Sequence, residues 1–305
     1  MELAVIILNW NATDDTLRCV RHVTAWQRVQ PTIWVVDNGS TDDSVQTILN
    51  EFPEIHLICN ATNQGFAGGN NRAIVAALAA GTAPILLLNN DALIEETDVV
   101  RLLETLAADK HIGFIGPLLF DAEEKDRLLA AGGRNPVRHH HSHILQLTPG
   151  QPVRIVEYVP GTALLGRSEP FRDVGLLDED YFFTMEVADL CMRARRHGYL
   201  SAIDTRARAF HAVDHRPSAL RETLYTYYII RNRFLFIRKF YPRLKFLFYA
   251  FWTLYSLALA LKMRLDGKPA TAQVVWLGLF DGLRGRFGGR NERVLAVSTA
   301  ASGAE

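Results

Sequence analysis

The run PILLLNND at residues 84–91 gives the clearest indication of the fold. Its apolar residues 85–88 have the length of a strand buried on both faces, and polar residues follow at once. Similar apolar runs lie at residues 3–8, 32–36 and 55–59, and the stretches between them have the pattern of helices. We place those helices at residues 16–26, 43–52, 71–80 and 97–108. Buried strands that alternate with helices predict an α/β protein whose parallel sheet is covered on both faces.

Polar residues follow each of the four expected strands. They form clusters at residues 9–11, 37–42, 63–71 and 89–91. In sheets of this kind, ligands bind beyond the carboxyl ends of the strands. We therefore expect the four clusters to form one polar site, although they lie far apart in the sequence.

The turns after the strands exclude two common kinds of nucleotide site. The turn after the first strand, Asn9 to Thr13, has no glycine, so a dinucleotide-binding GxGxxG turn is absent. No Gly-Lys-Ser/Thr sequence follows any of these strands, so a phosphate-binding P-loop is absent as well. A nucleotidyltransferase would need a basic glycine-rich loop after the first strand, and residues 9–13 do not provide one. A nucleotide site without either phosphate-binding loop needs another group to neutralise the diphosphate of the nucleotide, and a metal ion can do so. Asp91 is the candidate ligand for Mg²⁺ or Mn²⁺, although an isolated aspartate at a strand end more often caps a turn.

Composition and charge limit the class of protein. The chain has 305 residues, 49% of them hydrophobic and 22% charged, which is typical of a globular protein. Its net charge of zero gives no indication of a nucleic-acid partner. Three widely spaced cysteines favour a reducing cytoplasm, and the first residues do not resemble a signal peptide. The histidine-rich run at residues 139–143 has no accompanying carboxylate or cysteine, which favours a surface loop over a metal site.

The C-terminal part of the chain is basic and apolar. Residues 223–265 include eight Arg and Lys side chains and no Asp or Glu. Residues 246–261 carry no charge, and as a helix they would span about 24 Å, which is short of the hydrocarbon core of a membrane. Bases on both flanks suit a helix at an anionic membrane surface, whereas the alternative is a helix buried against the catalytic domain.

The motifs together resemble glycosyltransferase family 2, and their order and spacing resemble its rhamnosyltransferase-like branch. The first three are VVDNGSTD at residues 35–42, NQGFAGGN at 63–70 and LLNND at 87–91. Further along lie PGTA at 160–163, GLLDE at 175–179 and EVADLC at 186–191, and then His211, Arg231 and Asn232. The resemblance covers about residues 3–240. No single motif is specific, but the combination is.

This resemblance implies a GT-A fold, that is, a Rossmann-like and mostly parallel sheet flanked by helices, and an inverting sugar transfer. Asn9, Asn11 and Asp37 would bind the base and ribose of the donor. Its pocket would be lined by Asn63, Gly65, Asn70 and Asn90. Asp91 and His211 would contact the metal or the diphosphate, and Arg231 would pair with the diphosphate or begin the basic membrane face. Glycines at 65, 68 and 69 are expected where the backbone approaches a ligand.

The catalytic base is less clear from the motif. Family members commonly read Glu-Asp-x-Asp-Leu, but here the second position is Val187. An inverting transfer needs one carboxylate to accept the proton of the acceptor hydroxyl. Glu186 is the first candidate and Asp189 the second, with a structural role for Asp189 in the first turn of a helix as the alternative.

The sequence thus predicts two domains, a glycosyltransferase domain at residues 1–240 and a helical extension at 241–305. The expected activity is transfer of a hexose, with rhamnose suggested by the branch, from a nucleotide-diphosphate donor to a glycan or lipid-linked acceptor of the cell surface. We expect it to act in the cytoplasm at the inner face of the membrane. The alternative is a non-catalytic nucleotide-sugar-binding protein, which the valine at position 187 motivates.

Overall fold

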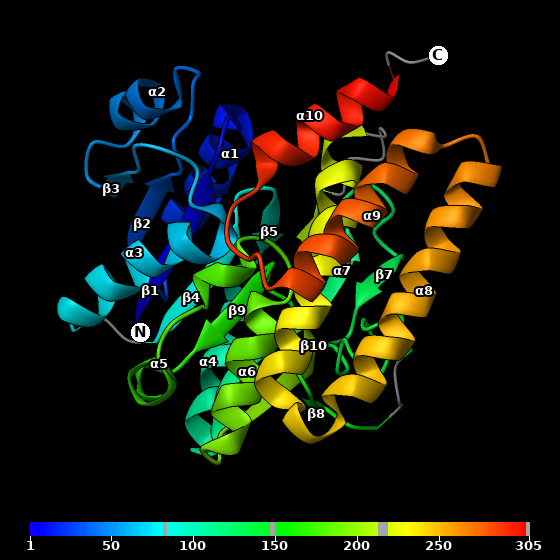
Figure 1. Cartoon of the computed structure of the whole chain (residues 1–305). Coiled ribbons are helices and arrows are strands. Elements are labelled where there is room, and N and C mark those ends of the chain that lie inside the picture. Colours follow the sequence, from blue (N-terminus) through cyan, green and yellow to red (C-terminus); the bar gives the residue numbers. More distant parts are fainter. Residues whose placement is uncertain (82–83, 147–149, 213–218, 303–305) are drawn as a thin grey trace. The chain divides into compact units, whose positions relative to one another are not determined.

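The computed structural model describes residues 1–81, 84–146, 150–212 and 219–302. The chain forms two compact units. We call the first, Met1–Leu177 with Val187–Val213, the sheet unit, and the second, Asp178–Glu186 with Asp214–Glu305, the helical unit. Figure 1 shows the elements of both. The predicted domains, 1–240 and 241–305, divide the chain at a different place and stay a prediction, because a compact unit is not by itself a functional domain.

One ten-stranded sheet lies at the centre of the sheet unit. Its strands are β1 (Glu2–Asn9), β2 (Gln30–Asp37), β3 (His56–Cys59), β4 (Ile85–Asn89), β5 (Ala92–Ile94), β6 (Ile112–Asp121), β7 (Leu128–Ala130), β8 (Val153–Val156), β9 (Ala163–Gly166) and β10 (Leu200–His211). The main path runs β3-β2-β1-β4-β9-β6-β10-β5, with β7 paired to β6 and β8 paired to β10.

The four strands that the apolar runs predicted are parallel, in the order β3-β2-β1-β4. Beyond β4 the sheet is mixed, since β9 is antiparallel to both β4 and β6, and β10 is parallel to β6 but antiparallel to β5 and β8. The sheet is therefore parallel in its first half and mixed in its second half. The predicted α/β class is confirmed.

Helices cover both faces of the parallel half. They are α1 (Thr13–Thr24), α2 (Ser44–Glu51), α3 (Gly65–Ala79) and α4 (Glu96–Ala108), followed later by α5 (Ser168–Val174) and α6 (Glu186–Arg196). The side chains of Leu3, Val5 and Ile7 pack into one core with residues of α1, α2 and α4. Ala4 and Ile6 are equally buried, and α3 packs on β1, β2 and β4. Burial on both faces explains why these strands have consecutive apolar residues.

Helix α3 corrects one sequence expectation. It begins at Gly65, earlier than the expected helix at residues 71–80, so most of the glycine-rich motif is helical. A Cβ atom on Gly69 would lie 2.5 Å from Cδ1 of Leu8. The packing of α3 on β1 thus gives Gly69 a structural role, and its approach to a ligand stays a prediction. Gly65 has a φ of +71°, which glycine adopts without strain.

The helical unit consists of α7 (Ala219–Phe240), α8 (Lys245–Leu265), α9 (Pro269–Arg284) and α10 (Asn291–Ser302), with short 3₁₀ turns η1 (Glu179–Tyr181) and η2 (Pro242–Leu244). It has its own core, in which Tyr227 and Tyr228 of α7 pack with Val274 of α9 and Val294 of α10. Phe182, from the segment after η1, joins this core.

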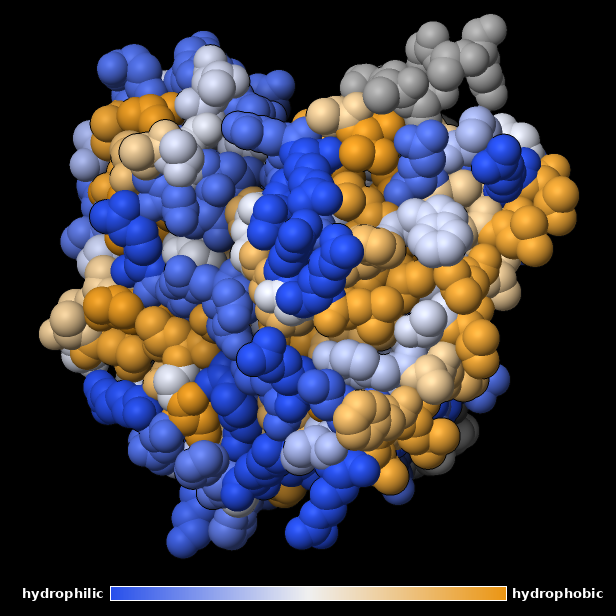
Figure 2. All heavy atoms as spheres, viewed as in Figure 1, coloured by the Kyte–Doolittle hydropathy of each residue, from blue (hydrophilic) through white to orange (hydrophobic). Residues whose placement is uncertain are grey.

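Helix α8 has one buried and one exposed face. Trp252, Ser256 and Ala260 are buried where α8 packs on α7 and α9. On the other face Phe246 is 86% exposed and Leu254 is 66% exposed, and Figure 2 shows hydrophobic residues gathered over α8 and α9. Among the described residues, Pro242–Leu265 is the one helical segment long and apolar enough to cross a membrane by length and composition. Helix α8 thus has a face buried against α7 and α9 and an exposed apolar face, and its contact with a membrane stays a prediction.

Candidate active site

Asp91 and His211 face each other where β4 ends. Asp91 lies in the short link from β4 to β5, and His211 is the last residue of β10. The pairing of β10 with β5 brings them together, because His211 is in register with Ala92 and the N–H of Ala212 donates to the carbonyl of Asp91 at 2.8 Å. Nε2 of His211 lies 3.0 Å from Oδ1 of Asp91. The structure therefore brings both predicted metal contacts to one point.

The environment of this pair suits a divalent metal. Oδ1 of Asp91 and Nε2 of His211 are buried, and neither makes a hydrogen bond with good geometry despite the short distance between them. Buried polar atoms are usually satisfied, so two facing atoms without partners indicate a site for a ligand. No group of three or more His, Cys, Asp or Glu side chains placed to hold a metal occurs in the described part of the chain. Mg²⁺ and Mn²⁺ commonly take one or two protein ligands, with substrate phosphate and water completing the set.

Cys19 lies near this pair but does not provide a thiolate. Burial, with a further contribution from the charge of Asp91, raises the pKa of the Cys19 thiol to about 12. Its Sγ lies 3.8 Å from the carbonyl oxygen of Asn89. Mg²⁺ and Mn²⁺ prefer oxygen and nitrogen ligands to sulfur, so the candidate ligands stay Asp91 and His211.

A chain of hydrogen bonds joins Asp37 to the link between β4 and β5, which carries Asp91. The amide of Asn9 donates to Oδ1 of Asp37 at 2.9 Å, and the oxygen of that amide accepts from the hydroxyl of Thr16 at 2.7 Å. Nδ2 of Asn90 donates to the same hydroxyl at 3.0 Å. Asn9 is fully buried and Asp37 is 2% exposed. The amide of Asn9 thus holds the Asp37 carboxylate in place, and the Thr16 hydroxyl links Asn9 to Asn90.

The loops after β1 and β2 are tied to each other. The backbone N–H of Asn11 donates to the Ser40 hydroxyl at 2.9 Å, and the side-chain oxygen of Asn11 accepts from the backbone of Thr41 at 2.8 Å. Asn11 has a φ of +49°, a conformation that asparagine tolerates better than most residues. Ser40 also donates its backbone N–H to Oδ2 of Asp37 at 3.1 Å.

Asn38 organises the start of α3. Its Nδ2 donates to Oδ1 of Asn63 and to the carbonyl of Gly65, both at 3.1 Å, and its oxygen accepts from Asn60 at 2.9 Å. Asn63 in turn accepts from the N–H of Gly65 at 2.7 Å. Asn70 is buried and donates to the carbonyl of Phe66 within α3. The hydrogen bonds of Asn38 and Asn63 determine the shape of the loop between β3 and α3. Contact with the donor stays a prediction for Asn63, Gly65 and Asn70.

The segment before Glu186 has an unusual backbone. Apart from Asn11, the described residues other than glycine with positive φ are Phe182 at 61°, Thr184 at 68° and Met185 at 69°. Such conformations cost about 1–3 kcal/mol each and concentrate at functional sites. Glu186 follows directly, begins α6 and is 6% exposed. The strain therefore lies next to the first candidate for the catalytic base.

Arg231 and Asn232 of α7 hold this strained segment. Nδ2 of Asn232 donates to the carbonyls of Tyr181, Phe183 and Thr184 at 2.8 to 3.1 Å. Nη2 of Arg231 donates to the carbonyls of Asp180 and Tyr181, at 3.0 and 2.9 Å. Both side chains are fully buried, and burial lowers the pKa of the Arg231 guanidinium. The hydrogen bonds of Arg231 thus hold the strained segment before Glu186. Its contact with a diphosphate stays a prediction.

Asp189 has a structural partner. Its Oδ1 accepts from Nε of Arg193 one helical turn later, at 2.6 Å, and Asp189 is fully buried. The same guanidinium donates to the carbonyl of Leu176 at 2.5 Å and to that of Val174. This ion pair joins α6 to the segment after α5 and gives Asp189 a structural contact, while its role as catalytic base or structural acid stays a prediction.

Four positions in or beside these networks were not singled out as site residues from the sequence. Thr16, Asn38 and Asn232 act through side-chain bonds to residues far away in the chain, and no local pattern reveals such bonds. Trp10 stands between Asn9 and Asn11 and is 41% exposed. An exposed tryptophan beside two polar residues is a signal that the sequence does contain.

The sequence is similar to a known family. The model described as glycosyl transferase family 2 matches residues 4–154. Low-salt glycan biosynthesis hexosyltransferase Agl10 of Haloferax volcanii is 25% identical, with 77% of this chain and 75% of that protein covered. The dTDP-rhamnosyl transferase RfbF of Shigella flexneri is 23% identical, with 77% and 79% covered. N-acetylglucosaminyl-diphospho-decaprenol L-rhamnosyltransferase of Mycobacterium tuberculosis is 28% identical, with 60% and 67% covered.

The fold is similar to solved structures as well. The mannosyltransferase PcManGT of Pyrobaculum calidifontis, solved with GDP-Man and Mn²⁺, aligns over 100% of this chain and 81% of its own with a TM-score of 0.58 and 15% identity. At this identity the likeness concerns the fold, which is the expected GT-A arrangement of a sheet with flanking helices.

Proposed function

Because the chain belongs to glycosyl transferase family 2 and is a nucleotide-sugar glycosyltransferase that resembles the rhamnosyltransferase-like branch, we propose that it transfers a hexose with inversion in a metal-dependent reaction. Rhamnose is the sugar that the names of two relatives favour. Mn²⁺ is the metal present in the mannosyltransferase structure.

The observation that carries this proposal is the buried pair of Asp91 and His211. Their facing atoms have no hydrogen-bond partners and lie at the end of β4. An imidazole nitrogen beside a carboxylate favours Mn²⁺ over Mg²⁺, since Mg²⁺ prefers oxygen ligands. A metal held there offsets the charge of the leaving diphosphate.

The residues around Asp37 would bind the nucleoside. Asp37 presents a carboxylate that Asn9 and the N–H of Ser40 hold in place, and such an acid suits the ribose hydroxyls. The neighbouring loop, with Asn11 bonded to Ser40 and Thr41, would form the edge of the base pocket. Trp10 would cover the base from this loop.

Glu186 would act as the base. It is buried at the start of α6, after the strained segment that Asn232 holds, whereas Asp189 is committed to Arg193. The Glu186 carboxylate would accept the proton of the acceptor hydroxyl as the anomeric carbon is attacked. One base suffices, because a leaving diphosphate needs no proton when its charge is stabilised.

The helical unit supports a lipid-linked acceptor at the inner face of the membrane. Exposed apolar residues of α8 lie between basic flanks at Arg243 and Lys245 and at Lys262 and Arg264. One relative is named for a decaprenol-linked acceptor. An apolar helix face with basic ends binds the headgroup region of anionic membranes. The relatives are named as transferases, which favours an enzyme over a non-catalytic binding protein.

The proposal is tested by donor turnover. Purified full-length protein is given a panel of nucleotide sugars that includes dTDP-rhamnose, with and without Mn²⁺, and release of nucleoside diphosphate is measured. We expect release with one donor only when Mn²⁺ is present, and a loss of about 100-fold or more in Asp91→Asn, since metals contribute several kcal/mol. Asp126→Asn, an exposed aspartate after β6, is the matched control. Full metal-dependent turnover in Asp91→Asn contradicts the metal assignment.

A further inference from the structure

Three residues that are far apart in the sequence form an apolar wall in the sheet unit. They are Phe66 at the start of α3, Gly161 in the segment before β9 and Val187 at the start of α6. A Cβ atom added to Gly161 would lie 3.1 Å from Cγ2 of Val187 and 3.2 Å from Cζ of Phe66. Because position 161 has no side chain, both apolar side chains lie against the backbone of this segment.

Hydrogen bonds fix the backbone that carries the phenylalanine. The carbonyl of Phe66 accepts from Nδ2 of Asn70 at 2.8 Å, and the carbonyl of Gly65 accepts from Asn38 at 3.1 Å. Val187 is 5% exposed, whereas Phe66 and Gly161 are partly exposed. The wall is therefore preformed, and part of it is open to solvent.

The wall lies at the end of β4 that leads to Asp91. The N–H of Asn89, the last residue of β4, donates to the carbonyl of Thr162 at 2.9 Å. Since β4 and β9 are antiparallel, Gly161 continues from Thr162 in the direction in which Asp91 follows Asn89. The anomeric carbon of a nucleotide sugar is bonded to its diphosphate. A diphosphate bound through a metal at Asp91 would therefore bring the sugar to this end of the sheet.

The chemistry of the wall suits a methyl group. Phe66 and Val187 have no polar side-chain atoms, and Gly161 has no side chain. Burial of a methyl group against carbon atoms is favourable, whereas a hydroxyl group buried there loses water without gaining a side-chain partner. A 6-deoxyhexose carries a methyl group where the corresponding hexose carries a hydroxymethyl group. The wall can therefore distinguish these two classes of sugar at C6.

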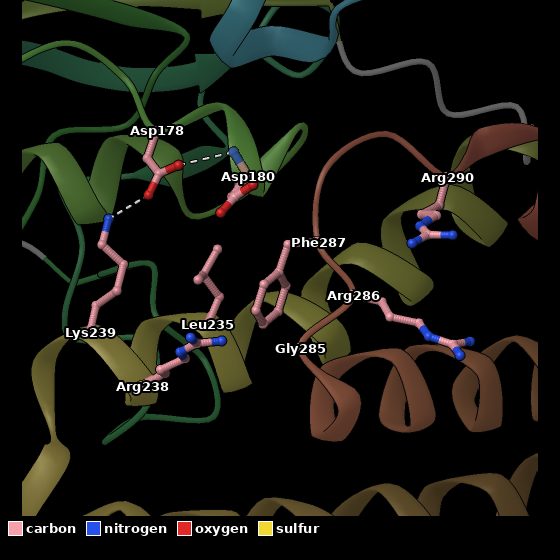
Figure 3. A pocket seen from close by; sticks show the side chains of 9 residues that line it. All are labelled: Asp178, Asp180, Leu235, Arg238, Lys239, Gly285, Arg286, Phe287 and Arg290. Carbon is pink, nitrogen blue, oxygen red and sulfur yellow. Dashed lines mark hydrogen bonds and ion pairs between the residues drawn. The ribbon is translucent and has the colours of Figure 1, made fainter.

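The pocket of the helical unit that Figure 3 shows has a different character. Six of its nine lining residues are charged, namely Asp178, Asp180, Arg238, Lys239, Arg286 and Arg290. Lys239 pairs with Asp178 at 2.6 Å within it. A methyl group gains little against charged side chains, so the wall in the sheet unit is the better site for the C6 methyl of a sugar.

We propose that Phe66, Gly161 and Val187 contact C6 of the donor sugar and select a 6-deoxyhexose over the corresponding hexose. The inference rests on the proposed glycosyl transfer and names the residues that determine which donor is used. It also gives a role to Val187, which stands where the family motif commonly has an aspartate. The valine then belongs to donor selection and is not a sign of lost activity.

Calorimetric titration of the full-length protein with nucleotide sugars, in the presence of Mn²⁺, tests the wall. The probes are two pairs, dTDP-L-rhamnose with dTDP-L-mannose and GDP-D-rhamnose with GDP-D-mannose, and the members of each pair differ only by the hydroxyl group on C6. We expect the 6-deoxy member of one pair to bind about 10–100-fold more tightly, the range for such a change in an apolar pocket. Equal affinity within both pairs, or no binding of either 6-deoxy sugar, overturns the proposal.

Val187→Thr replaces one methyl group of the wall by a hydroxyl group of similar size. We expect the preference for the 6-deoxy sugar to fall about five-fold or more, while the affinity for the nucleoside diphosphate alone stays unchanged. Val75→Thr makes the same exchange at a valine of α3 that is 54% exposed and should keep the preference of the wild type. Phe66→Ala removes the partly exposed ring and provides a second test should Val187→Thr be unstable. An unchanged preference in both wall variants contradicts the assignment.

These binding measurements need neither an acceptor nor turnover, so they separate this inference from the proposed function. Release of nucleoside diphosphate is measured in parallel. A 6-deoxy preference that depends on Val187, without turnover of any donor, contradicts the proposed transfer and leaves the sugar site standing. Metal-dependent turnover of a hexose donor that is as efficient as that of its 6-deoxy counterpart contradicts the sugar site and leaves the transfer standing.

Discussion

Two carboxylates of α6, three positions apart, have different surroundings. Asp189 accepts a hydrogen bond from Arg193 at 2.6 Å, and that arginine also binds the segment after α5. Glu186 begins the helix directly after Thr184 and Met185, which have positive φ, and Phe182 shortly before them has positive φ as well. The first arrangement is that of a structural ion pair, and the second is what we expect of the proposed base, because strained backbone concentrates at functional sites.

Substitution should separate these two roles. We expect Glu186→Gln to lower kcat by about 10²–10⁴-fold with little change in donor affinity, because only proton acceptance is lost. Asp189→Asn should instead reduce stability by about 3–5 kcal/mol, since it leaves the partly buried Arg193 without its partner. Steady-state kinetics and thermal unfolding of both variants provide the check. Normal kcat in Glu186→Gln with low kcat in a stable Asp189→Asn would reverse the assignment.

At the scale of elements, α7 stabilises a segment that would not keep its conformation alone. Three residues with positive φ carry an unfavourable energy of about 1–3 kcal/mol each. Asn232 donates to three carbonyls of this segment, and Arg231 donates to two. Hydrogen bonds from a buried, rigid helix can maintain such strain because breaking them leaves buried carbonyls unsatisfied.

Asn232→Ala should therefore act through the position of Glu186. We expect kcat to fall about ten-fold or more while the KM for the donor changes little, because the donor residues are in the sheet unit. The acid limb of the kcat–pH profile should also shift, which a purely structural loss of stability does not produce. Glu222→Gln, an exposed change on the same helix, is the control. An unchanged pH profile and kcat in Asn232→Ala contradicts this role.

The exposed face of α8 should determine membrane contact. Leu254→Asp places a charge on a side chain that is 66% exposed, so the fold should tolerate it, while insertion into the headgroup region becomes unfavourable. We expect binding to phosphatidylglycerol vesicles in a flotation assay to fall several-fold. Leu49→Asp, at a leucine of α2 that is 38% exposed, should bind as the wild type does. Equal loss in both variants speaks against a role for α8.

For the whole molecule, a net charge of zero conceals an uneven distribution. Eight bases and no acids lie within residues 223–265, so the remaining sequence is acidic. We therefore expect any attraction to an anionic surface to come mainly from this region. Salt screens exposed charges from each other beyond a distance that depends on its concentration. This distance is about 10 Å at 0.1 M salt and about 3 Å at 1 M salt.

Vesicle binding of the wild type should consequently depend on both salt and lipid charge. We expect strong flotation with phosphatidylglycerol vesicles at 50 mM NaCl, weaker flotation at 500 mM, and little with phosphatidylcholine vesicles at either concentration. Nucleoside diphosphate release should be insensitive to lipid charge when the acceptor is absent. Binding that ignores both salt and lipid charge shows that the basic residues do not contribute.

The sequence by itself determined the parallel half of the sheet and the polar strand ends at which we propose the donor site. Runs such as residues 85–88 are apolar at every position because both faces of the strand are covered, and this is visible locally. Polar residues at strand ends, including Asp37 and Asp91, follow from the same rule. The helix at α8 was also predicted, because sixteen uncharged residues between bases are a local signal.

Only the tertiary structure decided which of these residues act together. The pairing of β10 with β5 places His211 against Asp91, and the antiparallel strands that make this possible have no strong local pattern. Packing of α3 on β1 gave Gly69 its role, and buried bonds assigned Asn232 to the strained segment. These contacts join residues far apart in the chain, so they are decided by long-range packing that no local sequence pattern encodes.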